Sequence, residues 1–219
     1  GVRHCIKIAK KMGVKRFILM SANGVKQEGT MYQRTKWEAD EVLQASGLHW
    51  TIFRPSLIFG NPRGQGRTEF CTQLRNDMLS LPFPAPLFYE GLLPINVGTF
   101  AMSPIHVENV AEFFVKAINQ DESIGKVFNL GGTEPIYWKD IIHHIALSSG
   151  KPTWAIPTPV IAVKMVAAIF DRFPWFPITW DQLTMLMEGN IVEEQYFKEF
   201  DIVPKKFNLE NLCYLKVSQ

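Results

Sequence analysis

The chain has 219 residues, of which 47% are hydrophobic, enough for one sizeable core and ordinary for a globular domain. Its 23 basic and 21 acidic residues leave a formal net charge of +2 at pH 7. So weak a bias gives no electrostatic footprint for nucleic acid, and we expect no nucleic-acid partner. The length favours one domain, or one domain with a small additional lobe.

The cysteines and the apolar runs indicate in which compartment the protein lies and whether it can span a membrane. The three cysteines are Cys5, Cys71 and Cys213. They lie far apart without metal-ligand spacing, which suits a reducing compartment and predicts no metal site. The longest apolar stretch, Val160–Phe170, is too short to span a bilayer. With the aromatic run 173–177 it is interpreted as a core helix and packed loop, or as a membrane-surface contact. We therefore expect a cytoplasmic protein with at most peripheral membrane contact.

The first predicted element is a helix that ends at Gly13. Apolar residues from Val2 to Met12 recur at helical spacing, and glycine tolerates the positive φ of a helix C-terminus. No initiator methionine or capping residue precedes this helix, so we expect a truncated chain that begins inside an element. The continuous apolar run Arg16–Ser21 follows and is typical of a buried parallel strand.

A second helix and strand repeat this order. Tyr32–Ser46 is expected to be helical after a loop over Ala22–Met31, and Trp50–Arg54 is β-branched and aromatic, as strands are. Pro55 is expected to discourage extension of the strand. Alternating helices and strands predict βαβ units with right-handed crossovers, and therefore a parallel sheet.

The later elements are more varied. They are a loop over Asn61–Gly66, a helix over Thr68–Leu81, an irregular stretch over Pro82–Pro94, a strand over Ala101–Ile105, a helix over Glu108–Asn119 and a strand over Lys126–Leu130. The helix over Glu108–Asn119 is expected to bury Val110, Ala111, Phe114 and Ala117. From Tyr137 onward the chain is expected to be mostly helical, over Trp138–Ser148, Pro159–Phe170, Thr179–Glu188 and a segment from Asn208.

The residues with the clearest chemical meaning are Tyr32 and Lys36. Four positions apart on one helix, they share a face. A tyrosine phenol has a pKa of about 10, and a nearby ammonium favours the phenolate, which then exchanges a proton with a carbonyl or alcohol. The same lysine can hold a ribose hydroxyl. Parallel sheets place ligands at the carboxyl ends of their strands, where Ser21 and Pro55 are expected.

Several segments together resemble one protein family. They are Gly13–Ser21, Tyr32-x-x-x-Lys36, Thr51–Gly60, Ser103–Ala111 and Val127–Gly132. In this order they resemble the extended and atypical short-chain dehydrogenase/reductases, which include the NAD-dependent epimerases and dehydratases. The late segment Pro177–Leu183 is similar to the branch related to the NADPH-binding accessory subunit of respiratory complex I.

The resemblance implies an α/β fold. Residues 1–133 would be the C-terminal part of a Rossmann-type parallel sheet, with an insertion at about 61–99. Residues 134–219 would be a mostly helical C-terminal substrate lobe.

The resemblance also assigns roles. Tyr32 would be the catalytic acid/base, and Lys36 would bind the nicotinamide ribose and lower the pKa of the tyrosine. The residues expected beside the cofactor are Tyr32, Lys36, Pro55, Ser56, Leu57 and Ile58. The cofactor would be NAD or NADP, with a slight preference for NADP. Asn61 and Arg63 lie in a loop that would reach substrate or diphosphate.

Two departures from the family pattern bear on activity. Its glycine-rich dinucleotide loop is expected roughly 100 residues upstream and is not in this chain, so the chain alone should bind cofactor poorly. The family's catalytic hydroxyl corresponds to Ala22 here, so either Ser21 serves instead or the site lacks this donor. Loss of such a donor typically costs about 10²-fold or more in rate.

Three functions are therefore open. The first is an NAD(P)-dependent oxidoreductase that acts through Tyr32 and Lys36 on a small-molecule or lipid-like substrate. The second is a non-catalytic NADP(H)-binding accessory or assembly subunit of a respiratory or quinone-pathway complex. The third is a nucleotide-sugar epimerase or dehydratase, ranked last because such enzymes usually have a loop longer than Ala22–Met31. His106 is expected to be structural.

Overall fold

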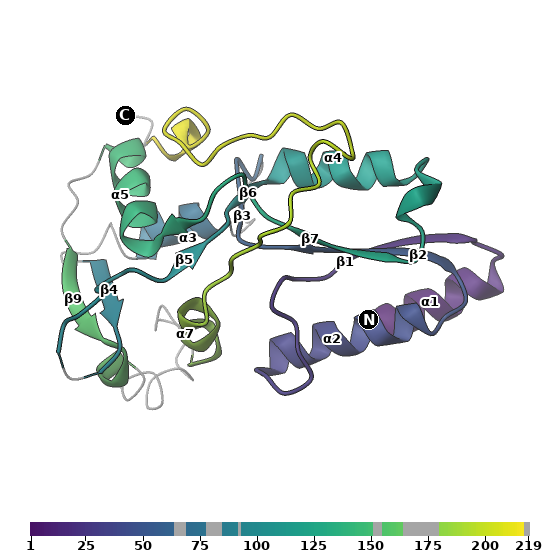
Figure 1. The fold of residues 1–219 in the computed structure, drawn as a ribbon, viewed down its shortest axis with the longest axis horizontal. Coiled ribbons are helices and arrows are strands. Elements are labelled where there is room, and N and C mark those ends of the chain that lie inside the picture. Colours follow the sequence, from purple (N-terminus) through teal and green to yellow (C-terminus); the bar gives the residue numbers. More distant parts are fainter. Residues whose placement is uncertain (64–68, 78–84, 92, 151–154, 164–179, 217–219) are drawn as a thin grey trace.

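A parallel sheet lies at the centre of the structure, a computed structural model that describes residues 1–63, 69–77, 85–91, 93–150, 155–163 and 180–216 (Figure 1). Its strands are β1 (Arg16–Met20), β2 (His49–Pro55) and β7 (Lys126–Leu130), in the order β1-β2-β7, and both pairings are parallel. Helices α1 (Val2–Lys11) and α2 (Met31–Gln44) cover one face, and α4 (Val107–Ala117) covers the other. The predicted α/β class is confirmed.

Apart from one short 3₁₀ turn near the amino ends of these strands, the remaining elements lie beyond the carboxyl ends (Figure 1). Three small strand pairs are formed by β3 (Ile58–Phe59) with β6 (Ile105–His106), β4 (Ala85–Tyr89) with β9 (Ala155–Pro159), and β5 (Ala101–Met102) with β8 (Ile136–Tyr137). The helices are α3 (Phe70–Asp77), α5 (Trp138–Ser149) and α7 (Trp180–Met187), and the short 3₁₀ turns are η1 (Asp121–Ser123) and η2 (Cys213–Leu215).

Local sequence explains where the first two helices begin and end. Gly13, at φ +70°, follows α1, and Gly47, at φ +75°, follows α2. Helix α2 begins with a capping box, in which the Thr30 side chain accepts from the Gln33 amide and the Gln33 side chain accepts from the Thr30 amide. The two exchanged bonds satisfy amides that a helix N-terminus leaves without partners.

Strand β2 has apolar residues on both of its faces at its centre, because both faces are covered. Ile52 packs with Leu19, Leu43 and other residues beneath α1 and α2, whereas the next residue, Phe53, faces α4. Phe53 lies in an aromatic cluster whose other members include Phe113, Phe128 and Phe200, with ring centroids 5.5 to 5.9 Å from its own. Successive strand residues point to opposite faces, so a strand between two layers reads as a continuous apolar run.

The chain after α7 returns to this sheet. Phe197, Phe200 and Ile202 are buried in the same aromatic cluster as Phe53. Residues 191–212 contain neither helix nor strand, and the helical segment predicted from Asn208 is only a short 3₁₀ turn, η2. This segment has no regular hydrogen-bond pattern, and the packing of Phe197 and Phe200 against the sheet fixes its position instead.

Other predictions need correction. The Pro82–Pro94 stretch contains β4, which pairs with the unpredicted β9, and Ala101–Ile105 is divided between β5 and β6. Pro55 belongs to β2, where its carbonyl accepts from the Asn23 amide.

Two helix predictions also change. In α4 Ala111 is exposed, and Phe113 is buried in its place. Residues 160–163 are helical, as predicted for Pro159–Phe170, but the rest of that helix and the aromatic run 173–177 lie outside the described residues. Among the described residues, no helix combines the length and apolar character needed to cross a membrane.

Candidate functional site

Tyr32, Lys36 and Ser21 come together where β1 ends and α2 begins. Ser21 directly follows β1, Tyr32 lies in the first turn of α2, and Lys36 lies one turn further. The Lys36 ammonium donates to the Met20 carbonyl oxygen at 3.2 Å and lies 5.8 Å from the centre of the Tyr32 ring. Lys36 therefore reaches from the helix to the carboxyl end of the strand, where parallel sheets place ligands.

The Ser21 hydroxyl is buried without a partner. Its residue is 4% exposed, and its Oγ makes no hydrogen bond, although its amide donates to the Phe53 carbonyl at 2.7 Å. A buried hydroxyl without a partner is unfavourable, and such groups in folded proteins call for an explanation. The described residues therefore leave the Ser21 Oγ at this strand end without a hydrogen-bond partner.

The protonation of Tyr32 differs from the expectation. Partial burial raises the pKa of the Tyr32 phenol above its ordinary value, whereas the resemblance implied a lowering by Lys36. The ammonium lies over the aromatic ring, a cation–π arrangement, and bonds to the Met20 carbonyl rather than to the phenol. Burial, and not the neighbouring ammonium, therefore sets the direction in which the pKa of Tyr32 is shifted.

The segment expected beside the nicotinamide is largely engaged within the fold. The Ser56 amide donates to the Leu130 carbonyl at 2.8 Å, and its hydroxyl donates to the Asn190 carbonyl at 2.7 Å. The Leu57 carbonyl accepts from the Ile105 amide at 2.8 Å, where β3 begins to pair with β6. These bonds fix the path of Pro55–Ile58 past the end of β2.

The loop residues Asn61 and Arg63 contact another part of the molecule. Asn61 accepts from the Arg63 amide at 2.9 Å, and Arg63 forms an ion pair with Glu108 at the start of α4. His106 is the N-cap of α4, and its Nδ1 accepts from the Glu108 amide at 3.2 Å. Burial, followed by the charge of Lys205, lowers the pKa of His106, which agrees with its predicted structural role.

Sequence reasoning missed a buried ion pair beneath the site. Asp40 lies one turn beyond Lys36 and is fully buried, and its Oδ2 accepts from Arg54 Nε at 2.9 Å and from Arg54 Nη2 at 2.8 Å. Arg54 is on β2, next to Pro55, so the pair ties α2 to the sheet. The i, i+4, i+8 spacing of Tyr32, Lys36 and Asp40 was a readable sign of a shared helix face.

Two glycines permit a close chain crossing near the site. A Cβ on Gly132 would lie 2.1 Å from the Pro104 carbonyl oxygen. A Cβ on Gly131 would lie 2.7 Å from the Cβ of Val192 and 2.8 Å from that of Ser103. Both positions therefore require the absence of a side chain where β7 ends.

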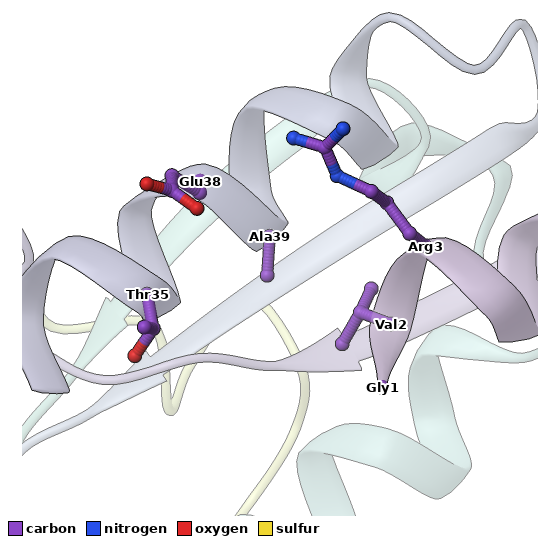
Figure 2. A pocket seen from close by; sticks show the side chains of 6 residues that line it. All are labelled: Gly1, Val2, Arg3, Thr35, Glu38 and Ala39. Carbon is purple, nitrogen blue, oxygen red and sulfur yellow. The ribbon is translucent and has the colours of Figure 1, made fainter.

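A pocket of about 260 Å³ lies between α1 and α2 (Figure 2). Its lining residues are Gly1, Val2, Arg3, Thr35, Glu38 and Ala39. Figure 2 shows Val2 and Ala39 facing the gap between the two helices. None of the predicted site residues lines this pocket.

Comparisons with known proteins agree with this geometry. Residues 1–77 match the family described as NAD(P)H-binding, which agrees with the predicted NAD or NADP cofactor. UDP-glucose 4-epimerase of Vibrio cholerae is 24% identical over 192 residues, which are 78% of this chain and 55% of that protein. The photosystem II assembly factor Ycf39 of Cyanophora paradoxa is 23% identical over 214 residues, 96% of this chain and 60% of that protein.

A solved structure shows the same fold. The NAD complex of UDP-glucose 4-epimerase from Thermus thermophilus superposes with a TM-score of 0.66 at 14% identity, over 98% of this chain and 67% of that one. The chain thus spans 55% and 60% of the lengths of the two curated relatives. It has the Rossmann-like α/β fold of NAD-binding epimerases and dehydratases, and its first 77 residues match the NAD(P)H-binding family.

Proposed function

We propose that the full-length protein is an NAD(P)-dependent oxidoreductase in which Tyr32 transfers a proton to its substrate. One arrangement supports this most directly: Lys36 links the Tyr32 ring to the carboxyl end of β1, beside the buried and unpartnered Ser21 hydroxyl. A bound nicotinamide would supply or accept the hydride. The substrate class that fits a proton-donating phenol is a carbonyl compound, small or lipid-like.

In this proposal each residue of the site has a separate role. Tyr32, 46% exposed and with a raised pKa, keeps its proton at neutral pH and suits the acid role in carbonyl reduction. Lys36 would hold the nicotinamide ribose, and Pro55–Ile58 would lie beside the ring. Ser21 would donate to the substrate oxygen in place of a hydroxyl at Ala22. In the same proposal, residues 1–133 carry the cofactor side of the site and residues 134–219 form the substrate lobe.

The test is Tyr32→Phe in the full-length protein, which removes the hydroxyl and keeps the ring. We expect kcat to fall by about 10²- to 10⁴-fold, with the Kd for NAD(P)H changed by less than about threefold. Tyr137→Phe is the matched control, because Tyr137 is 49% exposed and has Lys139 at 5.6 Å from its ring centre. Undiminished turnover by Tyr32→Phe on every substrate that the protein reduces would refute the acid role.

A second candidate is a non-catalytic NADP(H)-binding assembly or accessory subunit, in a respiratory or quinone-pathway complex. The likeness to an assembly factor over 96% of this chain supports it, as does Ala22 at the position of the family's hydroxyl. Partner proteins would then co-purify with the wild type and be lost on Lys36→Met, whereas Tyr32→Phe would leave them bound. A partner-free protein with robust reductase turnover would rule this candidate out.

A third candidate is a nucleotide-sugar epimerase or dehydratase. The likeness to UDP-glucose 4-epimerase supports it, although the short loop over Ala22–Met31 does not. Thermal stabilisation of the full-length protein by UDP-glucose, absent with glucose alone, would favour this candidate over the first two.

A further inference from the structure

The loop that leads from Ser21 to Tyr32 is held by a segment from the other end of the chain. Lys26 forms an ion pair with Glu188 Oε1 at 2.6 Å, and Gln33 Nε2 donates to Glu188 Oε2 at 2.9 Å. Asn23 Nδ2 donates to Asn190 Oδ1 at 2.6 Å and to the Ile191 carbonyl at 3.2 Å. Both carboxylate oxygens of Glu188 are therefore engaged by the loop and by the start of α2.

Residues 188–191, here called the latch, belong to the C-terminal lobe, and their backbone is hydrogen-bonded to the segment that contains β5. The Asn190 amide donates to the Ala101 carbonyl at 3.1 Å, and its carbonyl accepts from the Ser103 amide at 2.9 Å. Just before the latch, Leu186 and Met187 at the end of α7 pack against the apolar core that contains Trp138. A displacement of α7 is therefore passed to Glu188 and Asn190.

Gln33 connects Glu188 to α2, the helix that contains Tyr32. Its Oε1 accepts from the Thr30 amide at 2.9 Å, while its Nε2 donates to the Gly24 carbonyl at 3.1 Å and to Glu188. The residue is 3% exposed and directly follows Tyr32. Glu188 therefore fixes the orientation of the amide that completes the capping box, and with it the first turn of α2.

We propose that the 188–191 latch couples the C-terminal lobe to the acid/base site, with Glu188 as a positioning residue for Tyr32. This inference rests on the proposed function for its effect on turnover, but its structural half stands apart from it. A ligand that orders the lobe also orders the Ser21–Tyr32 loop, and by thermodynamic reciprocity a ligand at Lys36 orders α7 and the latch.

Hydrogen exchange of the full-length protein without ligand tests the structural half. In Glu188→Ala, exchange of the amides in residues 24–34 should quicken by about tenfold, because the loop and the start of α2 each lose a bond to the carboxylate. Glu188→Gln, which keeps one acceptor, should show a smaller increase. Glu193→Ala removes an exposed carboxylate five positions away and should leave this region unchanged. Equal exchange in Glu188→Ala and Glu193→Ala would overturn the proposal.

Turnover and cofactor binding test the coupling. Glu188→Ala should lower kcat by about ten- to 10²-fold with the KM for NADPH within about twofold, and Glu188→Gln should recover part of the loss. NADPH should slow exchange in residues 184–192 of the wild type and not in Glu188→Ala. An unchanged kcat together with NADPH protection in both proteins would refute the coupling. If Tyr32→Phe keeps full turnover while the exchange differences persist, the oxidoreductase proposal fails and the latch stands.

Discussion

Replacing Asp40 with alanine should weaken the attachment of α2 to the sheet. The carboxylate is fully buried, and its Oδ2 takes two bonds from Arg54, whose side chain is 23% exposed. Removing one partner of a buried pair typically costs about 3–5 kcal/mol of unfolding free energy. Here the partly exposed arginine regains some hydration, and the unpartnered Oδ1 no longer has to be buried. We therefore expect a loss of about 2–3 kcal/mol.

Urea unfolding of the full-length protein at pH 7 measures this loss. Asp40→Asn keeps the volume and an acceptor oxygen, so it should cost about 1 kcal/mol less than Asp40→Ala. The double variant Asp40→Leu/Arg54→Met replaces the pair by apolar groups and should lie within about 1 kcal/mol of the wild type. A loss below about 0.5 kcal/mol for Asp40→Ala, typical of exposed pairs, would refute the claim that this ion pair anchors α2.

Three further outcomes are expected of the full-length protein. Gly132→Ala places a methyl group 2.1 Å from the Pro104 carbonyl oxygen, so urea unfolding should show a loss of about 1–3 kcal/mol, and wild-type stability would contradict the close crossing. Phe53→Ala should cost about 3–5 kcal/mol in the same assay, because the ring is fully buried among other aromatic rings; a cost below about 1 kcal/mol would show that this core is loose. The lowered pKa of His106 means that its contribution to stability is present above the unfolded-state pKa of about 6.5 and is lost as the pH falls through that value towards the folded-state pKa. His106→Asn, which keeps an N-cap acceptor, should flatten the stability profile below about pH 6.5, and an unchanged acid slope would assign that slope to other groups.

The elements that the sequence predicted are those whose signals are local. Helices α1 and α2 show helical periodicity closed by Gly13 and Gly47, β1 is an apolar run between them, and β2 is a β-branched and aromatic run after α2. The order of these elements alone implies a parallel sheet, with Ser21 at a strand end near the Tyr32 helix. The structure adds the geometry of Lys36, which spacing could not provide.

The missed elements depend on partners that are distant in sequence. Strands β4 and β9 contain Pro86, Pro157 and Pro159, and prolines weaken the sequence signal of a strand. Within the described residues each of the two strands is paired only with the other, and neither sequence shows that pairing. The latch could not be predicted for the same reason, because Glu188 contacts Lys26 and Gln33, which lie far from it in the sequence. Periodicity reports which face of an element is buried, not what covers it.

The return of residues 197–202 to the sheet has a consequence for synthesis of the chain. Phe53 and Phe128 lie on the sheet face that Phe197 and Phe200 later cover. At about 5–20 residues per second, a ribosome needs roughly 4–14 s to travel from residue 130 to residue 202. During that interval the strands are complete, but their aromatic face lacks its final cover. The nascent protein therefore passes through a stage in which this aromatic sheet face is incompletely covered, and its packing waits until residues 197–202 have been made.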